Sequence, residues 1–177
     1  MPTLPPVIGF VAPSGTGKTT LLEQVITHLV ASGLKVAAIK HGHHPADPDI
    51  PGKDTHRFRQ AGAQTVLFAC PERWFMIQDL HHLPEPTLAQ QVERLIGHDL
   101  IVVEGYKEEA HAKIVMVRRE AGVHALHQSL KQVVAVATDD PELTTHLPML
   151  PLNDPRRVAG FIQEWLRTAP TVQDPRT

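Results

Sequence analysis

Cysteine is nearly absent from this chain of 177 residues, because Cys70 is its single thiol. An intramolecular disulfide is therefore impossible, and no zinc or redox motif built from paired cysteines can form. The sequence contains no run of about 18 apolar residues, so we expect no membrane span. Its start, MPTLPPVIGF, lacks the basic segment and the long apolar segment of a signal peptide. We therefore expect a cytoplasmic protein.

An excess of charge is lacking as well. The formal net charge is -2, which gives no general electrostatic attraction to nucleic acid or to an anionic membrane, so we expect neither as a partner. The apolar fraction of 42% is ordinary for a globular protein. The length suits one domain, which we place at residues 1–168, followed by a disordered tail at 169–177.

Strand-like and helix-like segments alternate along the chain. Short apolar runs predict strands at 7–12, 35–40, 100–104, 113–117 and 133–138, and helical spacing predicts helices at 21–30, from Thr87 and from Asp154. TVLFA and RWFMI predict a hairpin that extends the sheet. The expected fold is α/β, with a largely parallel central sheet, helices on both faces and an antiparallel hairpin extension. Ligands of such sheets bind at the carboxyl ends of the strands, here the loops after Ala12, Lys40 and Glu104.

The motif APSGTGKTT lies between the first strand and the first helix. Gly17, Lys18 and Thr19 fill the last three positions of the P-loop pattern GxxxxGK(S/T), and Ala12 stands where the first glycine belongs. The glycines let backbone N–H groups converge on phosphate oxygens at a helix N-terminus. Lys18 is predicted to reach the β- and γ-phosphates and Thr19 to ligate Mg²⁺. The predicted nucleotide-binding residues are Pro13, Ser14, Gly15, Thr16, Gly17, Lys18, Thr19 and Thr20. The alternative is a glycine-rich turn with a surface lysine.

A second element is the segment DLIVVEGYK. Its apolar residues deliver Glu104 to the end of a central strand, where a carboxylate can face the water shell of Mg²⁺. We predict that Lys18 and Glu104 are the catalytic residues and that Thr19 and Glu104 ligate the metal. A carboxylate that only ends a strand is the alternative.

The stretch KHGHHPADPDIPGKD, residues 40–54, follows the second strand. We predict a loop that faces an anionic ligand through Lys40, His41, His43 and His44 and brings an aspartate near Mg²⁺. Asp49 is the predicted residue, with Asp47 and Asp54 as alternatives. A solvated loop and a zinc site are the other interpretations.

Together, the P-loop, IKHGHH, PGKD, AGA and VEGYK occur in an order that resembles the family of molybdopterin-guanine dinucleotide biosynthesis protein B (MobB). The resemblance implies a GTP-binding homodimer with weak GTPase activity. It also implies a partner, the guanylyltransferase MobA, which attaches GMP to molybdopterin. VEGYK is similar to a motif of dethiobiotin synthetase, which implies that Thr19, Glu104 and a loop aspartate surround Mg²⁺.

Guanine recognition has no clear motif, since the NKxD signature of many GTPases is absent. Asp139 in ATDD is the predicted residue that accepts hydrogen bonds from guanine, with Asp154 in LND as a second candidate. Both have alternative interpretations as a turn residue and a helix cap. No strong base and no arginine finger can be assigned. Two rival functions are an ATP-dependent kinase or ligase of the dethiobiotin-synthetase kind and a metallochaperone GTPase.

Overall fold

A computed structural model of the chain describes residues 3–42, 44–121, 126–169 and 172–173. In chain order its elements are β1 (Thr3–Leu4), β2 (Val7–Val11), α1 (Lys18–Ala31), β3 (Val36–Lys40), α2 (Asp54–Gln60), β4 (Thr65–Ala69), β5 (Trp74–Gln78), α3 (Leu88–Glu93), β6 (Leu100–Glu104), β7 (Ala112–Val117), the 3-10 turn η1 (Arg119–Ala121), α4 (Leu126–Ser129), β8 (Val133–Thr138), β9 (Met149–Pro151), α5 (Pro155–Thr168) and β10 (Val172–Gln173). The chain divides into two compact units, residues 1–42 with 88–177 and residues 43–87.

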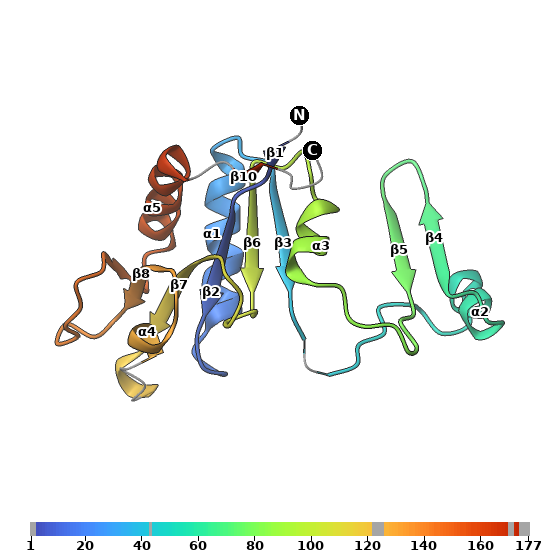
Figure 1. The fold of residues 1–177 in the computed structure, drawn as a ribbon, viewed down its shortest axis with the longest axis horizontal. Coiled ribbons are helices and arrows are strands. Elements are labelled where there is room, and N and C mark those ends of the chain that lie inside the picture. The colour runs from blue at the N-terminus through green and yellow to red at the C-terminus, as the bar shows by residue number, and fades with distance from the viewer. Residues whose placement is uncertain (1–2, 43, 122–125, 170–171, 174–177) are drawn as a thin grey trace. The chain divides into compact units, whose positions relative to one another are not determined.

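The first unit is built on a six-stranded sheet in the order β3-β6-β2-β7-β8-β9 (Figure 1). All five neighbouring pairs are parallel, which confirms the predicted sheet. Because the strands run the same way, the loops after β2, β3, β6, β7 and β8 all leave from one edge of the sheet. That edge contains the P-loop segment.

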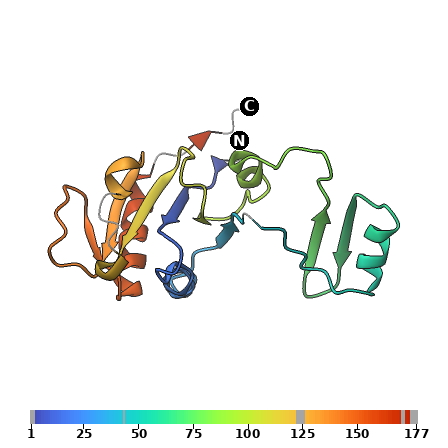
Figure 2. The same ribbon diagram turned by 90° about the horizontal axis from the view of Figure 1, so that it is seen from below.

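Helices cover both faces of this sheet, as expected. Val102 of β6 packs in one apolar cluster with α1 and α5, including Ile162, while its neighbours Ile101 and Val103 pack with Val92 of α3 on the other face. Figure 2 shows α1 and α3 on opposite sides of the sheet. Continuous apolar strands such as β6 follow from burial on both faces.

The helix ends agree only in part with the prediction. Helix α1 buries Leu21, Leu22, Val25 and Leu29, but Val30, the last residue of the predicted helical spacing, is 52% exposed. Helix α3 stops at Glu93, earlier than expected, because the following turns tighten into i→i−3 hydrogen bonds such as Leu95 N to Val92 O. Asp154 caps α5 as predicted, since its carboxylate accepts a hydrogen bond from the Arg157 backbone N–H.

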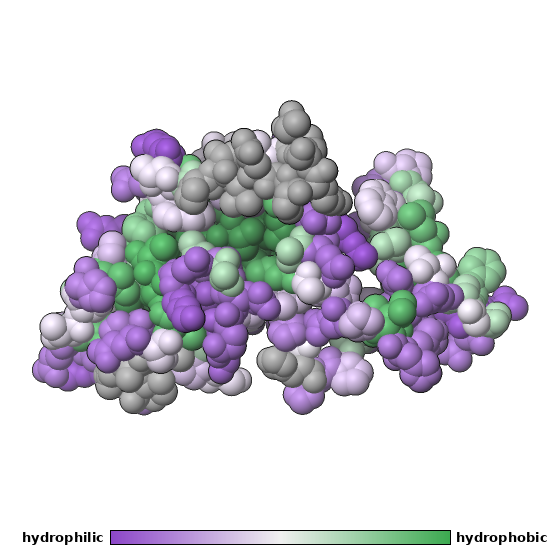
Figure 3. Space-filling model, in the orientation of Figure 1, coloured by the Kyte–Doolittle hydropathy of each residue, from purple (hydrophilic) through white to green (hydrophobic). Residues whose placement is uncertain are grey.

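The second unit consists of α2 and the antiparallel hairpin β4–β5. The hairpin is confirmed, and it forms a two-stranded sheet of its own. Apolar side chains on it are exposed, among them Leu67, Phe68, Trp74, Phe75 and Met76. The rings of Phe68 and Phe75 stack with centroids 5.2 Å apart. Figure 3 shows apolar surface on this unit.

The two ends of the described chain meet in a short antiparallel pair, in which Thr3 and Leu4 lie opposite Gln173 and Val172. Residues 172–173 of the predicted disordered tail are therefore paired. None of the helices in the described part of the chain is long and apolar enough to cross a membrane.

Candidate nucleotide-binding site

The segment from Ala12 to Gly17 forms the loop between β2 and α1 that the motif predicts. Gly15 and Gly17 have φ angles of 79° and 80°, in the left-handed region where glycine is favoured. Thr16 is buried, and its hydroxyl donates to the Pro13 carbonyl over 2.8 Å, which braces the turn. Since Ser14, Gly15, Thr19 and Thr20 are exposed, the loop is open to a ligand. Pro13 is half-buried beneath it.

Lys18 lies at the first position of α1, and its ammonium points back along the loop. Its Nζ donates to the Ala12 carbonyl oxygen over 3.4 Å and lies 3.9 Å from Glu104 Oε1. This contact uses only the backbone carbonyl of Ala12, so it does not depend on the glycine of the pattern. The lysine is thus held over the loop that is predicted to bind phosphate.

Glu104 connects three of the predicted residues. It ends β6, in register with Phe10 of β2 and Lys40 of β3, so the sheet brings it between the P-loop and the second loop. Thr19 Oγ1 donates to its carboxylate at 3.3 and 3.4 Å, and Lys40 Nζ lies 3.9 Å from Oε1. A hydroxyl and a carboxylate oxygen in contact fit the oxygen ligands that Mg²⁺ prefers. Thr19 and Glu104 therefore suit a magnesium site.

The loop after β3 packs against the EGYK segment. The His41 backbone N–H donates to the Glu104 carbonyl over 2.9 Å, and the His41 ring stacks on Tyr106 with centroids 4.3 Å apart. Gly105 has φ 106°, and a Cβ there would lie 2.9 Å from the His41 Cβ, so the glycine permits the close approach. The contact between His41 and Tyr106 was not predicted, because no local pattern joins residues so far apart in the sequence.

The other predicted loop histidines lie beyond the first unit. His43 lies outside the described residues, and His44 is exposed in the second unit. Lys40 and His41 belong to the first unit and lie beside Glu104. Of the predicted loop residues, these two have a described position at the P-loop edge.

Asp49 belongs to a separate network in the second unit. Its carboxylate accepts hydrogen bonds from the Thr55 hydroxyl at 2.8 Å and from Arg59 Nη1 at 3.3 Å. The Arg59 guanidinium also binds Asp47 at 2.9 Å and Asp79 at 3.0 Å. These hydrogen bonds from Arg59 lower the pKa of the Asp47 and Asp79 carboxyls, and the hydrogen bond to Asp79 contributes most to a raised pKa of Arg59. The role of Asp49 as a Mg²⁺ ligand stays a prediction.

Asp139 likewise has partners of its own. Its carboxylate accepts hydrogen bonds from Arg118 Nη1 at 3.1 Å and from the Arg119 backbone N–H at 2.9 Å. Arg118 in turn donates from Nε to the Thr16 carbonyl of the P-loop at 2.7 Å. Sequence reasoning missed Arg118, whose carbonyl partner lies 102 positions away. The role of Asp139 in guanine recognition also stays a prediction.

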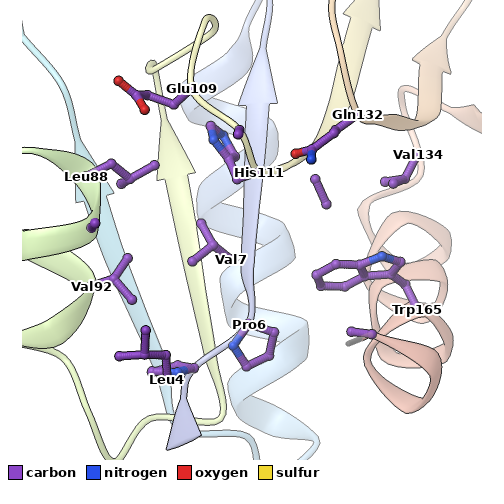
Figure 4. Close-up of a pocket in the computed structure, with 15 residues that line it drawn as sticks. Leu4, Pro6, Val7, Leu88, Val92, Glu109, His111, Gln132, Val134 and Trp165 are labelled. Atoms are coloured by element: carbon purple, nitrogen blue, oxygen red, sulfur yellow. The ribbon is translucent and has the colours of Figure 1, made fainter. Parts of the chain in front are cut away.

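A cavity of about 600 Å³ lies away from this edge, at the amino ends of the strands (Figure 4). Its walls are mainly apolar, and His111 and Trp165 line it. Both ring nitrogens of His111 lack a hydrogen-bond partner among the described residues, and burial lowers its pKa to about 4. The nearby Lys113 ammonium is buried and donates to the His111 and Lys131 carbonyls. Without a free cation on its described walls, this cavity does not suit phosphate.

The parallel sheet, the glycine-rich loop at its carboxyl edge and the lysine, threonine and glutamate that meet there define a P-loop NTPase fold. The family profile described as molybdopterin guanine dinucleotide synthesis protein B, MobB, matches residues 7–139. The chain belongs to the MobB family.

Known proteins similar to the chain agree with this assignment. This chain is 40% identical over 169 residues to the molybdopterin-guanine dinucleotide biosynthesis adapter protein of Escherichia coli, and the match covers 93% of this chain and 95% of that one. It is 39% identical to the protein of the same description from Haemophilus influenzae, covering 91% and 89% of the two chains. The crystal structure of a MobB homologue from Bacillus stearothermophilus superposes with a TM-score of 0.66 at 28% identity, over 92% of this chain and 98% of that one.

Proposed function

We propose that this protein binds Mg·GTP and acts as an adapter in the conversion of the molybdopterin cofactor to its guanine dinucleotide form. The observation that carries the proposal is the meeting of Lys18, Thr19 and Glu104 at the P-loop. The Escherichia coli and Haemophilus influenzae relatives are adapter proteins of this biosynthesis, which supports the adapter role.

One set of residues binds the phosphates of the nucleotide, and another binds the metal. The loop N–H groups and Lys18 bind the phosphates, while Thr19 and Glu104 hold Mg²⁺, which neutralises phosphate charge when bound. No described side chain at the P-loop is placed as a strong base for an attacking water, so GTP hydrolysis is slow. The protein therefore retains GTP for a partner in the cytoplasm.

The proposed partner and its substrate would meet this protein at the loop beside the nucleotide site. A guanylyltransferase of the MobA kind, which attaches GMP to molybdopterin, is the partner proposed here. Lys40 is 68% exposed beside Glu104, and His41 is fixed on Tyr106 next to it. Lys40, His41, His43 and His44 form the segment that meets the anionic molybdopterin or the partner.

The hairpin β4–β5 supports a homodimer. Trp74 is 67% exposed and Leu67 is 59% exposed, and Phe68, Phe75 and Met76 are each about two-fifths exposed. Exposed apolar residues gathered on a two-stranded ribbon favour burial against another protein surface. A second copy of the chain is the proposed occupant. Sedimentation of the Trp74→Ser variant as a monomer, with the wild type as a dimer, would support this.

Calorimetric titration of Mg·GTP and Mg·ATP into the purified protein tests the nucleotide assignment. We expect a clear preference for GTP with slow turnover, and loss of phosphate binding in Lys18→Ala. Lys107→Ala, which removes an exposed lysine of the EGYK segment, is the matched control. Nucleotide affinity retained in Lys18→Ala would overturn the P-loop assignment. A preference for ATP with turnover stimulated by a small substrate would move the kinase or ligase function to first place.

A further inference from the structure

Arg118 lies against the phosphate loop at the carboxyl end of β7, the neighbour of β2 in the sheet. Its Nε donates to the Thr16 carbonyl over 2.7 Å. Its Nη2 lies 3.3 Å from the place that a Cβ on Gly17 would occupy, so the guanidinium contacts two successive residues of the loop. Glycine is favoured at position 17 by its positive φ, and a side chain there would also press on the Arg118 guanidinium.

Asp139, at the end of the next strand β8, holds the arginine in place. One oxygen of its carboxylate accepts from Arg118 Nη1 at 3.1 Å, and the other accepts from the Arg119 backbone N–H at 2.9 Å. The Arg118 and Asp139 side chains are 35% and 26% exposed, and ion pairs in such positions contribute little to the stability of a fold. The geometry of this pair is better explained by its effect on the peptide group between Thr16 and Gly17.

That geometry sets the direction of one peptide group in the loop. In a trans peptide the C=O and the following N–H point to opposite sides of the C–N bond. Because Arg118 holds the Thr16 carbonyl toward β7, the Gly17 N–H points away from Arg118. In a P-loop the backbone N–H groups are the donors that cradle phosphate. The arginine thus orients one of these donors before any ligand arrives.

We propose that Arg118 is a positioning residue that preorganises the phosphate loop, and that Asp139 acts on the phosphate site through Arg118 and not on the guanine base. This inference rests on the proposed nucleotide binding. It gives Asp139 a different role from the one the sequence predicts, and it joins β2, β7 and β8 in one unit at the carboxyl edge of the sheet.

The experiment compares Arg118→Ala, Arg118→Lys, Asp139→Asn and the double variant Arg118→Ala/Asp139→Asn. Arg119→Ala is the matched control, because its guanidinium meets Glu142 at the surface, at 3.9 Å. The affinities for Mg·GTP and for the xanthine nucleotide Mg·XTP are measured. Hydrogen–deuterium exchange of residues 13–18 is followed in the nucleotide-free protein. Circular dichroism shows that each variant is folded.

We expect Arg118→Ala to weaken GTP binding about ten- to hundredfold, as for loss of a hydrogen bond to a charged group, with Arg118→Lys intermediate. Exchange of residues 13–18 should rise in Arg118→Ala, and added guanidinium ion should partly restore both properties. Asp139→Asn should weaken GTP and XTP alike. In the double variant, Asp139→Asn should cause no further loss of affinity beyond that of Arg118→Ala, because Asp139 acts through the arginine.

Two results would overturn the proposal. One is wild-type exchange and affinity in Arg118→Ala. The other is a switch of Asp139→Asn from GTP to XTP, since an asparagine at a base-reading position suits the 2-oxo group of xanthine. A wild-type protein that bound neither GTP nor ATP would refute the proposed function, whereas the exchange comparison would still decide the role of Arg118.

Discussion

Lys40 and Glu104 lie opposite each other on the parallel strands β3 and β6, with Nζ 3.9 Å from Oε1. Lys18 approaches the same oxygen at 3.9 Å, and Thr19 donates a hydrogen bond to the carboxylate. Two ammonium groups therefore share one carboxylate. Binding of Mg²⁺ at Glu104 would free both lysines for anionic ligands.

Glu104→Gln should mainly reduce the dependence of GTP binding on Mg²⁺. The amide keeps the shape of the side chain and removes the charge that a divalent cation requires. The ratio of GTP affinities with and without Mg²⁺, measured by calorimetry, should fall toward one. Glu108→Gln, which changes an exposed glutamate in the following loop, should leave this ratio unchanged. An unaltered ratio in Glu104→Gln would exclude the carboxylate from the metal site.

Gly105→Ala should destabilise the contact between the two loops at the nucleotide edge. The added Cβ would lie 2.9 Å from the His41 Cβ, and the residue has φ 106°, so a cost of about 1–3 kcal/mol in unfolding free energy is expected. Urea denaturation measures it. Gly160→Ala is the control, because Gly160 lies within α5 with open space around it and should gain about 0.5–1 kcal/mol. Equal effects in the two variants would contradict the packing described here.

Arg59→Ala should loosen the second unit. It leaves Asp47, Asp49 and Asp79 without the guanidinium that they share. We expect faster proteolysis and faster hydrogen exchange in residues 44–87. Arg57→Ala is the matched control, since it removes an exposed arginine of the same helix that pairs with Asp54 at 3.8 Å. Unchanged exchange in Arg59→Ala would show that the three carboxylates need no such bridge.

His111 should make the first unit sensitive to acid. Burial, with a smaller effect of Lys113, lowers the pKa of His111 from 6.5 to about 4 in the folded protein. The unfolded chain then binds more protons between these values. The destabilising contribution of His111 is therefore absent above pH 6.5 and grows as the pH drops toward 4, to on the order of 2 kcal/mol. Urea denaturation from pH 7.5 to 4.5 measures the loss, which should be smaller in His111→Leu. Equal slopes for the two proteins would refute the assignment.

The parallel sheet and the contact between Thr19 and Glu104 in the candidate site could be predicted from the sequence. A P-loop after one strand and a glutamate at the end of another must come together at the carboxyl edge of a parallel sheet, and Thr19 and Glu104 do so. The cap at Asp154 was equally predictable, because a local pattern carries it.

Other features depend on contacts between distant segments, which no local pattern encodes. Arg118 and Thr16 are 102 positions apart and meet only because β7 and β2 are neighbours. Arg59 gathers carboxylates from the loop before its helix and from the end of the hairpin, and Val30 is exposed in spite of its helical spacing. These facts follow from tertiary arrangement and not from residue type.

The chain passes from Lys40 into the second unit through His41 and Gly42 alone. A partner that restrains the second unit therefore acts on a backbone path of two residues that begins beside the Glu104 carboxylate. Because His41 contacts Tyr106 and donates to the Glu104 carbonyl, tension on this backbone would be transmitted to the carboxyl end of β6. Under the proposed function, docking of a partner on the second unit would therefore be mechanically coupled to the nucleotide site.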